Sequence, residues 1–129
     1  MADASAFLAV ILNEPERDDI ICALEGKEIL SVGCLSWEIG NAFTAMLKRK
    51  RLTEEQIMDG WNIYEEIVWR SVKANIPNAL RLSAKHNLYA YDAYYIEAAS
   101  RHGCPLLSLD LRMNEVGKLE NINVLEVSL

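Results

Sequence analysis

Four acidic side chains stand where the sequence predicts that a strand ends or a helix begins. Such positions direct side chains toward the carboxyl edge of a parallel sheet, where open α/β sheets bind their ligands. Carboxylates gathered there repel one another unless a cation joins them, and oxygen ligands suit Mg²⁺ or Mn²⁺ better than zinc. We therefore expect a divalent metal ion to be held jointly by Asp3, Glu38, Asp92 and Asp110.

Asp92 begins a helix that the sequence predicts over residues 92–102. Tyr95, Ile96 and Ala99 follow it at positions three, four and seven further on, so the acid starts the stripe that faces the core. Burying a lone carboxylate there would cost on the order of several kcal/mol, and a bound cation would remove that cost. The alternative is that Asp92 only caps the helix, where an acid interacts favourably with the helix dipole.

Asp110 and Glu38 occupy comparable places. Asp110 follows a continuous apolar strand predicted over residues 106–109, although it could equally be a turn-initiating acid that caps the next helix. Glu38 lies in the first turn of a helix predicted over residues 36–51, with Asn41 three positions further along the same face. The alternative for Glu38 is dipole stabilisation on a solvated face.

Short strands alternate with helices along the whole chain, which is typical of an α/β fold with a mainly parallel sheet. Thr53 and Gln56 form a capping box at the start of one helix. The predicted strands cover residues 28–32, 67–72, 106–109 and 123–127. The predicted helices cover residues 5–12, 15–26, 36–51, 53–66, 74–87, 92–102 and 113–118.

The composition indicates one globular domain over residues 1–129, since a chain of 129 residues can bury its own core. The net charge of -6 argues against a protein whose whole surface grips nucleic acid. Cys22, Cys34 and Cys104 form no CxxC pair, which indicates free thiols in a reducing cytosol. The longest apolar run, residues 6–12, is too short to span a bilayer, so we expect a cytoplasmic protein.

Four short motifs carry the acids, in an order and spacing that extends over nearly the whole chain. They are residues 3–6 (Asp-Ala-Ser-Ala), 38–42 (Glu-Ile-Gly-Asn-Ala), 91–95 (Tyr-Asp-Ala-Tyr-Tyr) and 107–110 (Leu-Ser-Leu-Asp). This set resembles the four motifs of the PIN domain family. More narrowly it resembles the VapC type, the toxin half of toxin–antitoxin pairs.

The resemblance implies a three-layer α/β/α fold around a mainly parallel central sheet, with an acidic pocket at one end. It implies an Mg²⁺- or Mn²⁺-dependent endonuclease that hydrolyses RNA phosphodiester bonds with a metal-activated water. The four acids would then be the catalytic, metal-binding residues, Ser108 would hold a metal-bound water, and Asn41 would support the glutamate or touch the substrate. It further implies a homodimer and a small antitoxin protein whose C-terminal segment lies across the acidic pocket.

The chain departs from the family pattern at Asp3, because only Met1 and Ala2 precede it where the family has a full strand. Two residues reach about 7 Å, so the first strand is expected to be a stub or missing. The natural protein could begin earlier, the stub could suffice, residues 7–12 could pair as a strand and displace Asp3, or the N-terminus could be disordered. We therefore expect weakened metal binding, and the alternative function is a catalytically weak or inactive PIN-like binding module.

Two further features could contact RNA. Trp37, Trp61 and Trp69 could stack on bases, although packing in a core or an interface is the simpler interpretation. A basic run could contact phosphates, or it could only complement the dipole at the end of its helix. This run consists of Lys48, Arg49, Lys50 and Arg51.

Overall fold

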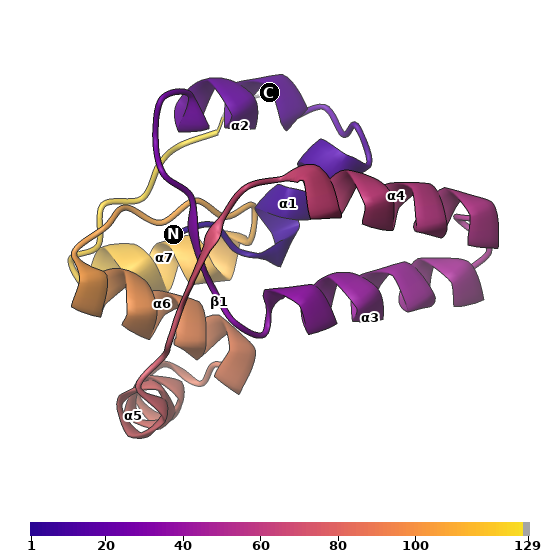
Figure 1. The fold of residues 1–129 in the computed structure, drawn as a ribbon. Helices are drawn as coiled ribbons and strands as arrows, with labels where there is room; N and C mark the ends of the chain where they lie inside the picture. Colours follow the sequence, from indigo (N-terminus) through magenta and orange to yellow (C-terminus); the bar gives the residue numbers. More distant parts are fainter. Residues whose placement is uncertain (128–129) are drawn as a thin grey trace.

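The computed structural model of this chain describes residues 1–127, in which helices cover both faces of a layer of short parallel segments (Figure 1). The helices are α1 (Ala4–Ile11), α2 (Arg17–Leu24), α3 (Leu35–Lys48), α4 (Glu54–Glu66), α5 (Ile76–His86), α6 (Ala90–His102) and α7 (Leu111–Leu119). The strands are β1 (Leu30–Val32) and β2 (Arg70–Val72). Within residues 1–127, no helix is long and apolar enough to cross a membrane.

The parallel pair of β1 and β2 is extended by backbone hydrogen bonds on the far side of β1. Ala2 donates its N–H to the carbonyl of Leu30 at 2.9 Å, and it also bridges in parallel to Leu107. Leu106 then bridges in parallel to Val124. The expected mainly parallel sheet is therefore confirmed. Its hydrogen-bonded segments follow one another in the order 70–72, 30–32, 1–3, 106–107 and 123–125.

The stub before the first acid lies at the centre of this layer. The amino group of Met1 donates to the carbonyl of Pro105 at 2.8 Å, and the carbonyl of Met1 accepts from the N–H of Leu107 at 2.7 Å. Met1 and Ala2 are both buried. Met1 and Ala2 are thus sufficient to pair with the neighbouring segments and to hold Asp3 at the edge of the layer. The alternative in which residues 7–12 pair as a strand is wrong, because α1 satisfies these backbone groups internally.

All four predicted strands are shorter than expected. β1 covers three of the residues predicted over 28–32, and β2 covers three of those predicted over 67–72. Residues 106–109 and 123–127 make isolated parallel bridges at Leu106, Leu107 and Val124 instead of regular strands. The physical reason is the length of the neighbouring segment. The two-residue stub offers residues 106–109 too few backbone partners for a longer ladder.

Helix α6 begins two residues earlier than predicted. Tyr89 is its N-cap residue, with extended backbone and no side-chain cap hydrogen bond, and Ala90 is its first residue. Asp92 therefore lies inside the first turn, so the alternative in which it caps the helix is wrong. Gly103 ends the helix with φ +61, as its position in the sequence predicts.

Other helix starts also differ from their predicted caps. The side chain of Asp3 caps α1, where Ser5 was the predicted cap. Cys34 precedes α3 without a side-chain cap, so Ser36 does not cap that helix either. The predicted capping box before α4 is present. Asp3 therefore also caps a helix, which its motif alone did not predict.

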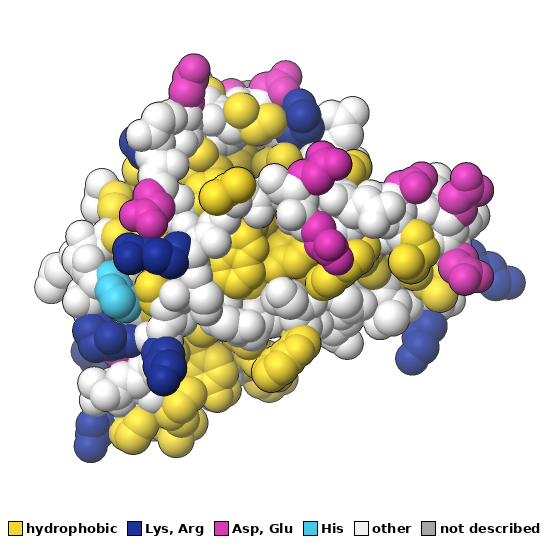
Figure 2. Space-filling view, viewed as in Figure 1, with side chains coloured by type: hydrophobic (Ala, Val, Ile, Leu, Met, Phe, Trp, Pro, Cys, Tyr) yellow, Lys and Arg dark blue, Asp and Glu magenta, His cyan; other side chains and the backbone are white. Residues whose placement is uncertain are grey.

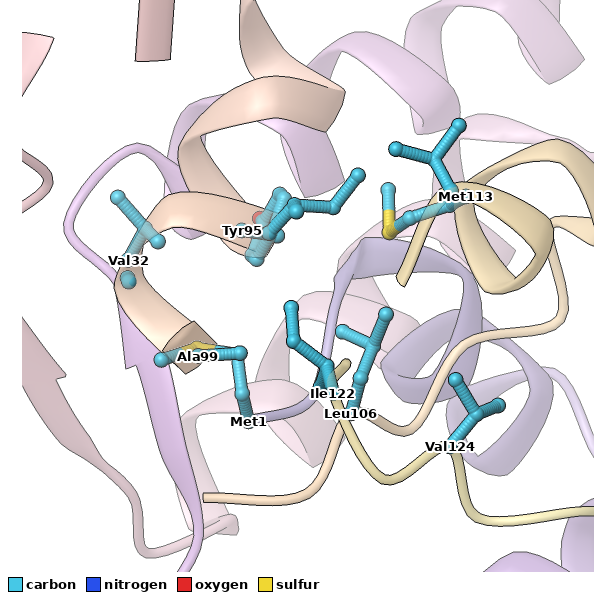
Figure 3. Packing of buried hydrophobic residues seen from close by; sticks show 11 residues of the cluster. Met1, Val32, Tyr95, Ala99, Leu106, Met113, Ile122 and Val124 are labelled. Carbon is cyan, nitrogen blue, oxygen red and sulfur yellow. The ribbon is translucent and has the colours of Figure 1, made fainter. Parts of the chain in front are cut away.

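Two apolar clusters pack on opposite faces of the layer, because consecutive residues of an extended segment point to opposite sides. Met1 and Leu106 belong to one cluster, whereas Ala2 and Leu107 belong to the other. The second cluster contains buried side chains of α1, α2, α3 and α4. This arrangement confirms the three-layer α/β/α fold. Figure 3 shows the first cluster, in which the layer meets α6 and α7 through Val32, Tyr95, Ala99, Leu106, Met113, Ile122 and Val124.

Candidate active site

The four predicted acids all lie at the N-terminal ends of helices. Asp3 and Asp110 are the N-cap residues of α1 and α7, and Glu38 and Asp92 lie in the first turns of α3 and α6. Helix N-termini carry partial positive charge and free N–H groups, which favour carboxylates. The sheet connections bring these helix ends together at the carboxyl edge of the layer, as the sequence predicts.

Asp3 is held by hydrogen bonds to both of its carboxylate oxygens. Its Oδ1 accepts from the hydroxyl of Ser5 at 2.7 Å and from the N–H of Ala6 at 3.2 Å, while Oδ2 accepts from the hydroxyl of Ser108 at 2.7 Å. Asp3 is only 4% exposed. Burial raises the pKa of this carboxyl, although the two serine hydroxyls and the Ala6 N–H partly counteract the rise. The predicted alternative of a disordered N-terminus is therefore wrong.

Ser108 links two of the acids. Its Oγ donates to Asp3 and accepts from the backbone N–H of Asp110 at 3.0 Å. Its carbonyl accepts from the side-chain amide of Asn114 at 2.8 Å, which fixes the turn into α7. These contacts give Ser108 a positioning role. The metal-bound water assigned to it by the resemblance stays a prediction.

Glu38 is oriented by a buried tyrosine and a cysteine. The hydroxyl of Tyr95 donates to its Oε2, and the Cys34 thiol donates to the same oxygen at 3.5 Å. Burial raises the pKa of Glu38, and the charges of Asp3 and Asp92 add to the rise. Burial, followed by the charge of Glu38, raises the pKa of the Cys34 thiol to about 11, so this thiol stays protonated at neutral pH.

The charges of the four acids affect one another. Burial raises the pKa of Asp92, and the charges of Asp110 and Asp3 raise it further. The side chain of Asp110 accepts from the N–H of Met113 at 3.0 Å, which caps α7 as the alternative for that residue predicted. Capping and membership of an acidic group are therefore compatible at this position. All four predicted acids are close enough to interact electrostatically.

The carboxylate oxygens of the four acids are ligands that Mg²⁺ or Mn²⁺ prefers, but they do not surround a single point closely enough to enclose an ion. Within residues 1–127, no group of three His, Cys, Asp or Glu side chains is close enough to hold a metal ion as it stands. Mg²⁺ usually keeps several waters and binds through one or two carboxylates, so it does not need such a group. Burial, and to a lesser extent the charges of the neighbouring acids, raise the pKa values of Asp3, Glu38 and Asp92, and a bound cation would relieve both costs.

The comparisons with known proteins agree with this geometry. The PIN domain family profile matches residues 1–119. The chain belongs to the PIN domain family. Ribonuclease VapC3 of Pyrobaculum aerophilum is 25% identical over 89% of this chain and 92% of its own length. VapC ribonuclease Mb0985 of Mycobacterium bovis is 30% identical over 93% of this chain and 92% of its own length. This PIN domain is therefore of the VapC type.

A solved structure supports the fold of this PIN domain independently. The crystal structure of PAE2754 from Pyrobaculum aerophilum superposes with a TM-score of 0.63. The superposition covers 89% of this chain and 83% of the PAE2754 chain, and the two sequences are 21% identical. At that identity the likeness bears on the fold alone.

The remaining predicted site residues of this PIN domain lie further from the acids. Asn41 is exposed on α3, one turn after Glu38. The basic run occupies the opposite end of α3, about 15 Å from Glu38 along the helix axis. Lys48 is the last residue of α3, and the other three follow it, all exposed. This run therefore lies outside the acidic group, and RNA contact there stays a prediction.

Sequence reasoning missed three residues that position the acids. Ser5 was interpreted as a helix cap, Tyr95 as core and Cys34 as a free thiol. The thiol is indeed unpaired, as are the other two cysteines. Two spacings in the sequence could have indicated these contacts. Ser5 lies two residues after Asp3, and Tyr95 lies one helical turn after Asp92. Neither spacing identifies which carboxylate the hydroxyl will contact.

Tyr95→Phe is expected to lower RNA cleavage by about 10- to 100-fold, the usual cost of losing a residue that orients a metal-binding group. The substitution removes only the hydroxyl that donates to Glu38, and the ring keeps its place in the core. Cleavage rate and Mn²⁺ affinity should fall together, with little change in the far-UV circular dichroism spectrum. Tyr94→Phe on the same helix is the matched control. Equal activity of the two variants would contradict the positioning role.

A large cavity among the described residues lies away from the acids. It has a volume of about 550 Å³ and is lined mainly by apolar side chains of α1 and α2, with Ile29 and Ile67, and Asp18 and Glu25 also line it. Figure 2 shows apolar side chains between α2 and α4 on this face of the PIN domain. None of the four acids lines this cavity, so cavity size does not locate the candidate site.

Proposed function

We propose that this PIN domain is a metal-dependent endoribonuclease, in which Asp3, Glu38, Asp92 and Asp110 bind Mg²⁺ or Mn²⁺. The observation that carries the proposal is the position of these four carboxylates at four helix N-termini, where burial and then their mutual charges raise the pKa values of Asp3, Glu38 and Asp92. The relatives named as VapC ribonucleases supply the substrate class. They also support the proposal that the chain is the toxin of a toxin–antitoxin pair in the cytoplasm.

The protein's own residues would divide the work as follows. Asp3 is fixed by Ser5 and Ser108, and Glu38 is fixed through Oε2 by Tyr95, so both enter the reaction with their carboxylates already oriented. Asp92 is half-buried, with no hydrogen bond among the causes of its shifted pKa, so its oxygens are available. A bound metal would supply an activated water and positive charge at the phosphate. Cleavage should leave 5′-phosphate and 3′-hydroxyl ends.

Backbone N–H groups at the four helix N-termini are a second feature of this site that would favour substrate binding. They attract an anionic phosphate, and they partly offset the repulsion between the substrate and the acids. The basic run of residues 48–51 is proposed to add phosphate contacts at the far end of α3. A homodimer, and an antitoxin whose C-terminal segment covers the acidic pocket, complete the proposal as partners.

Removal of the metal is expected to reduce RNA cleavage to the uncatalysed background. A fluorescently labelled RNA is incubated with the protein in EDTA, and Mg²⁺ or Mn²⁺ is then added in excess. Activity should return with either ion, and calorimetric titration of Mn²⁺ should give a weak dissociation constant, as the open donor set predicts. Ca²⁺, which prefers a larger and more flexible ligand shell, is the comparison ion.

Two results would count against this function. Cleavage that persists in EDTA would exclude metal-dependent hydrolysis. No cleavage with any ion, in a protein that is folded and monodisperse, would favour the alternative of an inactive PIN-like binding module. That alternative rested on displacement of Asp3, and the hydrogen bonds of Asp3 to Ser5 and Ser108 weaken it.

A further inference from the structure

A cleft between α5 and α6 brings basic side chains together away from the four acids. Its volume is about 330 Å³, within the range of roughly 300–1,000 Å³ that small-molecule sites occupy. Figure 2 shows Lys and Arg side chains over α5 and the C-terminal end of α6, on the left of the view. We call this hollow the basic cleft. It is lined by Asn78, Arg81, Leu82, Lys85, Glu97, Ser100, Arg101 and Glu120.

The basic cleft and the acids use different faces of α6. Tyr95 lies one turn after Asp92 and contacts the acidic group, whereas Glu97, Ser100 and Arg101 line the cleft. Glu97 follows Asp92 by five residues, which turns it about 140° around the helix axis. None of the four acids lines the cleft. A ligand held there therefore goes beyond the proposed nuclease reaction.

Arg81 is the cation of the cleft whose charge is least neutralised. Its Nη1 donates to the side-chain oxygen of Asn78 at 2.8 Å, and that amide carries no charge. None of the ion pairs among residues 1–127 involves Arg81. The hydrogen bond orients the guanidinium, and most of its five N–H groups stay available to a ligand.

Lys85 and Arg101 are oriented by carboxylates and keep unused donors. Nζ of Lys85 donates to Oε1 of Glu120 at 2.9 Å, and an ammonium group has further N–H bonds to offer. Nε of Arg101 donates to Oε1 of Glu97 at 2.8 Å, and its Nη2 donates to the carbonyl of Lys73. Within residues 1–127, these bonds leave Nη1 of Arg101 unused.

The two carboxylates of the cleft already have partners. Glu97 is 4% exposed, and its Oε2 accepts from the N–H of Asn75 at 2.8 Å. Nε2 of His86 lies 2.6 Å from Oε1 of Glu120, and hydrogen bonds from His86 and Lys85 lower the pKa of Glu120. Three cations and two carboxylates leave the lining with a net positive charge, whereas the whole chain carries -6.

These donors suit a phosphate group. Arginine binds phosphate through two parallel N–H···O bonds, and lysine adds a point charge. Ser100 is exposed at the cleft and offers a hydroxyl donor. A phosphate monoester carries about -1.5 to -2 charges at neutral pH, more than a phosphodiester, and so gains most from these cations. A hollow of this size suits a small molecule, whereas an RNA chain needs an extended groove.

We propose that the basic cleft binds a small phosphate monoester, held jointly by Arg81 and Lys85 of α5 and Arg101 of α6. The ligand bridges the two helices and needs no metal ion. Because it binds only the folded protein, it raises stability. A 5′-phosphorylated end of RNA offers the same chemical group, and the experiment separates the two sources.

The test titrates the ¹⁵N-labelled, metal-free protein first with inorganic phosphate and then with uridine 5′-monophosphate. NaCl holds the ionic strength constant. Amide signals of residues 78–85 and 97–101 should shift in a saturable way. Arg81→Gln should raise both dissociation constants at least about tenfold, the usual cost of losing a hydrogen bond to a charged group. Ser100→Asp should abolish saturable binding by repulsion, whereas Ser100→Ala should keep most of it.

Lys27→Gln is the matched control. It removes one positive charge from an exposed residue between α2 and β1, outside the cleft. This variant should bind inorganic phosphate as its parent does. Excess uridine 5′-monophosphate should raise the Tm of the parent and of Lys27→Gln, and it should leave the Tm of Arg81→Gln nearly unchanged.

Shifts that follow ionic strength alone would overturn the proposal, as would an Arg81→Gln variant that binds phosphate as tightly as its parent. Two short RNAs complete the test. Tighter binding of a hexanucleotide with a 5′-hydroxyl would make the cleft a contact for phosphodiesters, against the proposal. Binding of the 5′-phosphorylated hexanucleotide without binding of uridine 5′-monophosphate would assign the cleft to RNA ends and would equally exclude a small-molecule site.

Discussion

Asp92→Asn is expected to reduce RNA cleavage at least about a hundredfold, because even residues that only orient a metal-binding group cost 10- to 100-fold when they are lost. Asparagine has nearly the same shape as aspartate, so the first turn of α6 should keep its structure. The variant loses a negative charge from the group that interacts with Asp3 and Asp110. Initial rates in Mg²⁺ measure the effect. Asp59→Asn, at an exposed position on α4, is the control.

The same substitution is expected to stabilise the metal-free protein at neutral pH. The folded-state pKa of Asp92 is raised above its ordinary value of 3.8, so the folded chain binds the proton more tightly than the unfolded chain. The stability contributed by that proton is fully present below pH 3.8 and is lost as the pH rises through the folded pKa. Asparagine carries no such charge. Its advantage over the parent should therefore be absent in acid and grow toward neutrality.

Thermal melts in EDTA, between about pH 4 and pH 7, measure this trend. The melting temperature of Asp92→Asn should exceed that of the parent at the upper end, and the two should converge at the lower end. Adding Mn²⁺ should stabilise the parent more than the variant, because binding to the folded state alone raises stability. A variant that is both active and no more stable than its parent would contradict the role of Asp92.

Ala2→Pro is expected to destabilise the fold by about 3 kcal/mol, the order of an unpaired buried backbone group together with a steric clash. Ala2 is 2% exposed and lies in the middle of the parallel layer. Its N–H donates to Leu30, and its carbonyl accepts from the hydroxyl of Ser31 at 2.7 Å. Proline has no N–H to donate and is not tolerated inside a sheet. The midpoint of urea denaturation, followed by tryptophan fluorescence, measures the loss.

Ala4→Pro is the matched control for that experiment. Ala4 is the first residue of α1, where proline is well tolerated, and it lies only two positions away. Asp3 before it has φ -92 and ψ 178, the extended conformation that a residue preceding proline adopts. We expect a much smaller change in the denaturation midpoint. Equal losses at the two positions would mean that the stub does not contribute as a sheet segment.

The acids and the alternation of strands and helices were accessible from sequence because each depends on a local pattern. Asp110 follows an apolar run, Glu38 and Asp92 begin apolar helical stripes, and the capping box before α4 is a short fixed motif. These signals lie within one helical turn of the residue concerned. They predicted which residues stand at helix starts, and the order and family of the motifs predicted that these starts share one edge.

The inaccurate predictions concern contacts between distant parts of the chain. Nothing near Tyr95 in the sequence indicates that its hydroxyl contacts Glu38, which is 57 residues away. Helix α6 begins at Ala90 without a capping side chain, so no local capping motif marked its first turn. The lengths of the strands near residues 106 and 124 depend on the two residues before Asp3. A local pattern cannot report how many backbone partners a neighbouring segment will offer.

The central place of the stub also bears on when this protein can acquire its activity during synthesis. The hydrogen bond from Ser108 to Asp3 joins residues 105 positions apart, so Asp3 cannot reach this partner until residue 108 has been made. A ribosome adds about 5–20 residues per second, and contacts between such distant residues form slowly. A nascent or prematurely released chain therefore has Asp3 without Asp110, and its acidic group is incomplete. If the protein is a ribonuclease, its own sheet order keeps the enzyme inactive until the segment that carries Ser108 and Asp110 has been made.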